Sequence, residues 1–291
     1  NGIAYRVLCQ RPGDIIILDE TAHPLLKGAG LIPGLVQAES YIVKGKRGIF
    51  TAKQIEPLIT SPKGHNIPSP RIVSVEQSTN FGGGAIWPLS TLKEVCSLAH
   101  RYSIYTHMDG ARLLNAVVET NISAAQYAQD FDSVWIDFSK SLGAPMGAVL
   151  AGSQAFIEDA WYYKFQQGGG LHQAGIIAAG CLYGLKHNFS RIPDIHAKTK
   201  QLALFLSQLP FIVLNPLEVE TNVIICEVRH PTYSAISLAS GLLEKGIRVL
   251  ALDESRIRIM THLDISLSDI EEICKAFEEL GSTIYSKRGA L

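Results

Sequence analysis

The residue best suited to chemistry is Lys140, which follows a predicted strand inside a loop of small residues, 137–147. Glycine at 143 and 147 and alanine at 144 let the backbone approach a bulky ligand closely. A lysine amine withdrawn from water loses its proton readily enough to attack a carbonyl group and form a Schiff base. A solvated loop lysine accounts for this segment alone equally well.

A second polar segment, residues 106–116, follows the preceding predicted strand and contains Asp109 and Arg112. Open α/β sheets bind ligands outside the carboxyl ends of their strands, so Asp109 and Lys140 are expected to face one crevice. A carboxylate there would keep a pyridine nitrogen protonated, as pyridoxal 5'-phosphate (PLP) requires when it takes up the electrons left at Cα by a breaking bond. Arg112 would bind a substrate carboxylate through its guanidinium fork. A structural Asp–Arg ion pair is the alternative that these two residues leave open.

The elements that must position these residues follow a βαβ pattern. Residues 88–101 predict an amphipathic crossover helix, because a proline suits the first turn and apolar side chains recur on one face. The pattern as a whole predicts an α/β fold with a mainly parallel sheet. Short apolar runs predict its buried strands at 14–18, 71–75, 104–108, 133–137 and 148–150.

The character of the sequence changes near residue 189, where a long helical pattern begins a smaller α+β domain. We therefore expect a large cofactor-binding domain at 1–188 and a small C-terminal domain at 189–291. In the last predicted helix, Ser268 and Glu271 have the spacing of a capping box, and Gly281 is expected to end the helix.

Composition excludes several classes of function. With 26 Lys+Arg against 27 Asp+Glu in 291 residues, neither nucleic acid nor a membrane surface is an expected partner. No apolar run approaches the roughly 20 residues that cross a bilayer. The five cysteines are scattered and form no C-x-x-C pair, so no metal site and a reducing, cytoplasmic location are expected. Residues 60–70, rich in proline, predict a surface loop.

Two long motifs make the sequence similar to a known family. H-x-D-G-A-R-L-x-N-A stands at 107–116, and S-K-x-L-G-A-P-x-G stands at 139–147. The pair resembles the threonine aldolase group of the β-eliminating lyase family, and lesser matches extend the resemblance over the whole chain. The resemblance implies the PLP-dependent, aspartate-aminotransferase-like fold known as fold type I. It also implies a homodimer or homotetramer with active sites at the dimer interface.

The resemblance assigns roles to five residues of this chain. Lys140 matches the Schiff-base lysine, and Asp109 matches the partner of the pyridine nitrogen. Arg112, beside the cofactor, and Arg258 match the ligands of the substrate carboxylate. His23 matches the histidine that stacks on the cofactor ring, and it is expected to serve as the catalytic base.

The chain departs from the family pattern at four places. Thr79 stands where a histidine near the substrate hydroxyl is usual, and a threonine cannot act as a base near neutral pH. His172 replaces the arginine that reaches a neighbouring subunit's cofactor phosphate. An acidic residue and paired glycines are missing from 24–31. The Gly-Thr phosphate turn that precedes Asn1 in the family is absent, so we expect a missing upstream part or weak PLP binding.

Three functions are compatible with these residues. The first is a PLP-dependent aldehyde-lyase that converts L-threonine or L-allo-threonine to glycine and acetaldehyde. The second is an alanine racemase or β-eliminating lyase of the same fold, which the change at Thr79 would favour. The third is a catalytically silent homologue. The preference between threo and erythro substrates does not follow from the sequence.

Overall fold

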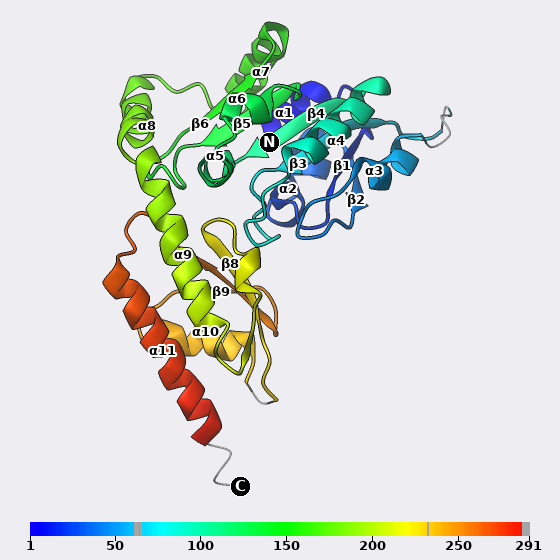
Figure 1. Ribbon diagram of the computed structural model, residues 1–291. Coiled ribbons are helices and arrows are strands. Elements are labelled where there is room, and N and C mark those ends of the chain that lie inside the picture. Colours follow the sequence, from blue (N-terminus) through cyan, green and yellow to red (C-terminus); the bar gives the residue numbers. More distant parts are fainter. Residues whose placement is uncertain (61–63, 65, 232, 287–291) are drawn as a thin grey trace. The chain divides into compact units, whose positions relative to one another are not determined.

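The computed structural model describes residues 1–60, 64, 66–231 and 233–286, and the chain divides into two compact units, Asn1–Phe189 and Ser190–Leu291 (Figure 1). Each unit has its own sheet and its own hydrophobic core. The sequence places the boundary between residues 188 and 189. Of the predicted surface loop 60–70, residues 61–63 and 65 lie outside the described residues. Within the described ranges, no helix is long and apolar enough to cross a membrane.

The first unit is built on a six-stranded sheet with the order β2-β1-β3-β4-β5-β6. The first five strands in this order run parallel to one another. The last strand, β6, is antiparallel to β5. The strands are β1 (Ile15–Asp19), β2 (Glu39–Val43), β3 (Pro70–Glu76), β4 (Tyr105–Gly110), β5 (Ser133–Asp137) and β6 (Ala148–Gly152). Five of them are the predicted ones, but β6, which was predicted to be buried, is mostly exposed because it is the other edge strand of the sheet. The edge strand β2 was missed because most of its residues are exposed or half-buried, so no apolar run marks it.

Helices cover both faces of this sheet, and alternation along β1 shows why. Ile15 and Ile17 point to one face and pack in a core shared with α3 and α4, whereas Ile16 and Leu18 pack in a core shared with α1 and η1. The helical elements of the unit are α1 (Gly2–Leu8), α2 (His23–Leu26), η1 (Leu31–Val36), α3 (Ala52–Ile59), α4 (Leu89–Arg101), α5 (Leu113–Thr120), α6 (Ala124–Ala128), α7 (Gln154–Gln166) and α8 (Gly175–His187).

The crossover helix predicted at 88–101 is confirmed as α4. Pro88 precedes its first turn in extended conformation, and the apolar positions Leu92, Val95 and Ala99 are buried. Burying three such side chains contributes several kcal/mol, at about 25 cal/mol per Å² of apolar area. The helix returns the chain to the start of β4, so β3 and β4 end side by side.

The second unit is a four-stranded antiparallel sheet with helices, as the α+β pattern predicts. Its strand order is β7-β8-β10-β9. The strands are β7 (Ile212–Val213), β8 (Val223–Val228), β9 (Leu250–Ala251) and β10 (Arg256–Met260). The helices are α9 (Ile192–Leu206), α10 (Ala235–Glu244) and α11 (Leu267–Ser286), with the short turns η2 (Phe189–Arg191) at the unit boundary and η3 (Pro216–Glu218).

The ends of α11 differ from the prediction. The box at its start is made by Ser266 and Asp269: the Ser266 hydroxyl accepts from the Asp269 amide at 3.1 Å, and the Asp269 carboxylate accepts from the Ser266 amide at 2.7 Å. The predicted pair, Ser268 and Glu271, therefore lies two residues too late. The helix also runs through Gly281, whose position packs against the Phe211 ring. A glycine chosen for close packing gives the same sequence signal as one that ends a helix.

Candidate active site

Polar side chains gather at the edge of the first sheet where its parallel strands end. Asp109 lies near the end of β4, and Lys140 follows the end of β5 by three residues. The two strands are neighbours, and Asp109 is in register with Trp135 of β5. Carboxyl ends of parallel strands meet at one edge, so the topology brings the two predicted residues to the same side of the unit.

Asp109 is buried, with 2% of its surface exposed, and both of its carboxylate oxygens are held. The side-chain amide of Asn1 donates from Nδ2 to Asp109 Oδ2 at 2.6 Å, and the Ala111 backbone amide donates to Oδ1 at 3.1 Å. Each oxygen keeps a second lone pair for a further donor. The carboxylate is therefore fixed in orientation and still able to accept from a ligand.

Behind Asp109 lies a buried hydrogen-bond network centred on the Asn1 amide oxygen. Trp135 donates to this oxygen from Nε1 at 2.8 Å, and His107 Nε2 lies 2.9 Å from it. An indole nitrogen only donates, so the Asn1 oxygen must be the atom that faces it, and His107 must carry its proton on Nε2. His107 Nδ1 then accepts from the Ser133 hydroxyl at 2.7 Å.

All donors of this network point the same way, from Ser133 through His107 and Asn1 to the Asp109 carboxylate. Burial holds the pKa of His107 well below its ordinary value, so the imidazole is neutral and its Nδ1 is free to accept from Ser133. The aligned dipoles point a hydrogen-bond donor at the Asp109 carboxylate. This role of Asn1 could not be predicted from sequence patterns, because its partners lie more than 100 residues away.

Lys140 is held by Asp137, the last residue of β5. Its Nζ lies 2.5 Å from Asp137 Oδ2, and 5.2 Å from the centre of the Trp135 ring. The other Asp137 oxygen accepts from the Ser139 amide at 2.7 Å and the Ser139 hydroxyl at 2.6 Å. Burial alone would raise the pKa of Asp137, but the bonds from Lys140 and Ser139 outweigh it and lower that pKa.

Glu76 and Arg112 are both buried beside Asp109, and each affects the pKa of the other. Glu76 is in register with Asp109 on neighbouring strands, and 7% of it is exposed. Burial, and then the charge of Asp109, raise the pKa of Glu76 to about 8, while Arg112 acts in the opposite direction. Burial lowers the pKa of Arg112, and Glu76 and Asp109 oppose that change. A cation is thus retained next to two carboxyl groups, where it could bind an anionic ligand group.

His23 begins α2, directly after the turn that follows β1. Its side chain is exposed in part, and desolvation lowers its pKa from the ordinary value. Asp109 raises that pKa, while Lys140 and Arg112 lower it, so all three lie within electrostatic range of the imidazole. A mostly neutral imidazole near pH 7 is able to accept a proton.

Thr79 is buried, and its hydroxyl has a structural partner. The Thr79 Oγ1 atom accepts from the Ala85 backbone amide at 3.0 Å, and the two residues also pair through the Thr79 amide and the Ala85 carbonyl. These bonds close the loop after β3. The hydroxyl hydrogen remains the one group that Thr79 could offer to a ligand.

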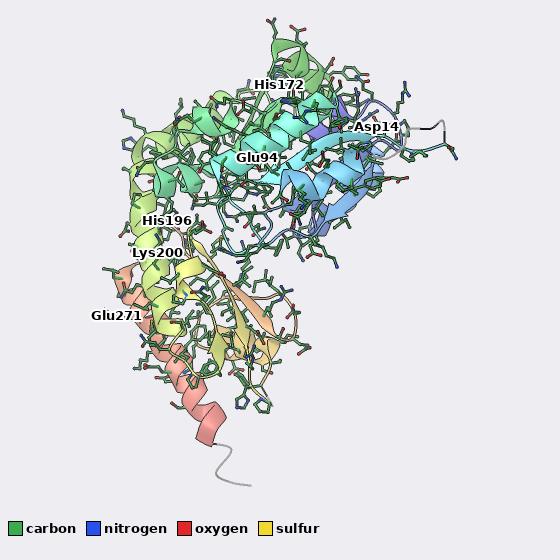
Figure 2. The ribbon with its side chains drawn as sticks, turned by 45° about the vertical axis from the view of Figure 1, so that its right-hand side comes forward. Asp14, Glu94, His172, His196, Lys200 and Glu271 are labelled. Carbon is green, nitrogen blue, oxygen red and sulfur yellow. The ribbon has the colours of Figure 1, made fainter. Side chains whose placement is uncertain are left out.

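The remaining two predicted residues lie on other elements of the chain. His172 lies in the loop between α7 and α8, where its side chain is exposed (Figure 2). Arg258 lies in β10 of the second unit, where it is half-buried. Their roles stay predictions that rest on the resemblance.

A cavity of about 710 Å³ opens beside Asn1 and Trp135, with Val149, Trp161 and other apolar side chains in its wall. Neither Asp109 nor Lys140 lines it, so it is not where reacting atoms would lie. Over the described residues, no group of three or more His, Cys, Asp or Glu side chains could hold a metal ion.

Comparison with known proteins identifies the family. The family described as "Beta-eliminating lyase" matches residues 1–229. Low-specificity L-threonine aldolase 1 of Arabidopsis thaliana is 33% identical over 282 residues, which are 96% of this chain and 79% of that protein. The low specificity L-threonine aldolase of Escherichia coli (strain K12) is 29% identical over 275 residues, which are 94% of this chain and 79% of that protein.

Solved structures show the same fold at lower identity. A threonine aldolase from Leishmania major superposes with a TM-score of 0.78 at 16% identity, covering 96% of this chain and 81% of that one. An aspartate aminotransferase from Rhizobium meliloti superposes with a TM-score of 0.69 at 13% identity, covering 94% and 72%. The predicted aspartate-aminotransferase-like α/β fold is confirmed.

The matches also confirm the prediction of a PLP-dependent lyase, and they do not favour a racemase or a silent homologue. The two motifs at 107–116 and 139–147 both lie within the matched residues. The chain belongs to the β-eliminating lyase family and is most similar in sequence to low-specificity L-threonine aldolases among the relatives described above.

Proposed function

We propose that this chain is a PLP-dependent aldehyde-lyase that cleaves L-threonine or L-allo-threonine to glycine and acetaldehyde. The observation that carries the proposal is the oriented carboxylate of Asp109 at one strand end, with Lys140 in a small-residue loop at the neighbouring strand end. The names of the relatives supply the substrate class.

The residues present fit PLP by the chemistry of their donors. Asp109 offers an oriented acceptor for a pyridinium N–H, Lys140 an amine for the aldehyde carbon, and His23 an aromatic face for the ring. When bound, the cofactor supplies an electron sink for the pair released at Cα. His172 is assigned to the cofactor phosphate on the resemblance alone.

The other predicted residues would bind and orient the amino acid. Arg112 and Arg258 are assigned to its carboxylate, which a guanidinium fork binds through two parallel hydrogen bonds. His23 would remove the proton from the β-hydroxyl group, directly or through a water, because its lowered pKa leaves it neutral. Thr79, with its oxygen already bonded to the Ala85 amide, would at most donate a hydrogen bond to the substrate.

Organisation and location complete the proposal. We assign cofactor binding to the large domain, residues 1–188, and residues 189–291 to a small C-terminal domain. The resemblance supports a homodimer or homotetramer with its active sites at the dimer interface, in the cytoplasm. The expected partner is a small amino acid; neither nucleic acid nor a membrane is proposed.

A direct test is aldehyde release from L-threonine and L-allo-threonine, with added PLP and an alcohol dehydrogenase to report acetaldehyde. Activity with either isomer that disappears in Lys140→Ala supports the proposal. A folded, PLP-loaded protein that releases no aldehyde, and instead exchanges the Cα hydrogen of alanine with solvent deuterium, would replace it with a racemase.

A further inference from the structure

Asp137 is a charged side chain of the site to which the predicted mechanism gives no part. It is largely buried, with 12% of its side chain exposed, and its carboxylate is fixed at both ends. One oxygen is held by Ser139, through both the amide and the hydroxyl, and the other faces the Lys140 amine. A carboxylate that is fixed by Ser139 in this way keeps the Lys140 amine in one position.

The backbone around Lys140 keeps the pair together. The Lys140 carbonyl accepts from the Gly143 amide at 2.9 Å, which closes a tight turn after the lysine. The Ala144 amide donates to the Phe138 carbonyl, also at 2.9 Å, across the same loop. Asp137 itself pairs with Ala148 in the β5–β6 ladder. Both ends of the ion pair therefore rise from ordered backbone.

Other charges near the lysine do not replace Asp137. His23 and Glu76 lie within electrostatic range of Lys140. Arg112 lies within electrostatic range of Asp137. Among the described residues, Asp137 is the one carboxylate within ion-pair distance of Lys140 Nζ. A carboxylate at this distance holds the amine by an ion pair and a hydrogen bond, so the amine must leave Asp137 before it can attack a carbonyl.

We propose that Asp137 is the resting partner of Lys140, holding its amino group in an ion pair whenever that group is not bonded to the cofactor. Asp137 is in this sense a positioning residue. It lowers the reactivity of the free lysine, and it gives the amine a fixed place to return to when a substrate amine displaces it. The inference rests on the proposed function for its biological meaning, but the ion pair can be tested without the cofactor.

The first measurement is the reactivity of Lys140 in the cofactor-free full chain. Trace acetylation at pH 7, with the modified lysines resolved by mass spectrometry, compares wild type with Asp137→Asn and Asp137→Glu. Asparagine keeps an oxygen for the Ser139 donors and removes the charge that holds the amine, so Lys140 labelling should rise about fivefold to tenfold. Glutamate keeps the charge and should leave labelling near the wild-type value. Equal labelling in all three proteins would reduce Asp137 to a turn residue and overturn the proposal.

A matched control comes from the second unit, where Lys198 Nζ lies 2.6 Å from Asp194 Oδ2. Asp194→Asn should leave Lys140 labelling unchanged. If Asp137→Asn fails to fold, wild type alone decides: raising the salt concentration to about 0.5 M screens a partly exposed pair and should increase Lys140 labelling. Lys140 labelling that does not change with salt concentration would then overturn the proposal.

A second measurement separates this inference from the proposed function. With PLP added in a stopped-flow instrument near pH 7, the visible band should form about fivefold faster in Asp137→Asn than in wild type. Equal rates would contradict a part for Asp137 in cofactor attachment. Absence of a band in every variant would overturn the proposed function, while the labelling result would still stand or fall by itself.

Discussion

The Asn1 side chain joins Asp109 to His107, two residues of β4 that do not bond to each other directly. Its Nδ2 atom lies 2.6 Å from Asp109 Oδ2, and its Oδ1 atom lies 2.9 Å from His107 Nε2. Because Trp135 also donates to that oxygen, the amide has one allowed orientation. The carboxylate proposed to meet the cofactor is thus oriented by a residue 108 positions away in the sequence.

Replacing Asn1 by alanine is expected to weaken PLP binding about tenfold. The change removes a charge-assisted hydrogen bond to Asp109, a class of bond worth about 1.5–3 kcal/mol, and leaves the Trp135 and His107 donors without their acceptor. The measurement is the dissociation constant of PLP from fluorescence or absorbance titration. Gln10→Ala, at an exposed position just after α1, is the control. Unchanged affinity in a folded Asn1→Ala protein would show that Asp109 needs no such support.

The neutral state of His107 predicts a specific dependence of stability on pH. Its pKa is depressed in the folded protein, whereas an unfolded histidine titrates near pH 6.5. Below about pH 6.5 His107 binds a proton in the unfolded chain but not in the folded protein. The free energy of unfolding is therefore intact above that pH and falls as pH decreases, by up to about 1.4 kcal/mol per pH unit from this group.

Urea unfolding of wild type and His107→Gln at pH 7.5 and 5.5 tests this dependence. Glutamine can donate to Asn1 and accept from Ser133 but does not titrate, so the variant should lose less stability between the two pH values. If the free energy of unfolding changed equally in wild type and variant between pH 7.5 and 5.5, His107 would be protonated in the folded protein at the lower pH, contrary to the prediction.

Much of the first unit followed from sequence pattern alone. The buried strands β1, β3, β4 and β5 are apolar runs, and their order along the chain dictates that Asp109 and Lys140 reach one edge. The support for those residues could not be predicted, because the contacts of Asn1 join residues separated by more than 100 positions. The partner of Lys140 could have been predicted from local sequence. Asp137 precedes Lys140 by three residues, and Asp-x-Ser favours a turn that brings the two side chains together.

Thr79 illustrates how a motif position can acquire a structural partner. The resemblance places it near the substrate hydroxyl, and the structure also gives its oxygen to the Ala85 amide in the loop after β3. Sequence alone cannot rank these uses, because both need only a hydroxyl group.

The structural use of Thr79 predicts a difference between two substitutions. Thr79→Val leaves the Ala85 amide buried without its acceptor and should cost about 1–3 kcal/mol. Thr79→Ser keeps the hydroxyl and should lose only the about 1 kcal/mol of a buried methyl group. Urea unfolding measures both. Equal stability of the two variants would show that the bond to Ala85 contributes nothing.

The central claim, that Lys140 carries PLP beside Asp109, has a direct spectroscopic test. Purified protein is mixed with PLP, and its visible absorbance is recorded before and after borohydride, for wild type and for Lys140→Ala. The account predicts a band in wild type that borohydride fixes to the chain at Lys140, and no such band in Lys140→Ala. A band of equal strength in Lys140→Ala, or borohydride attachment at another lysine, would contradict it.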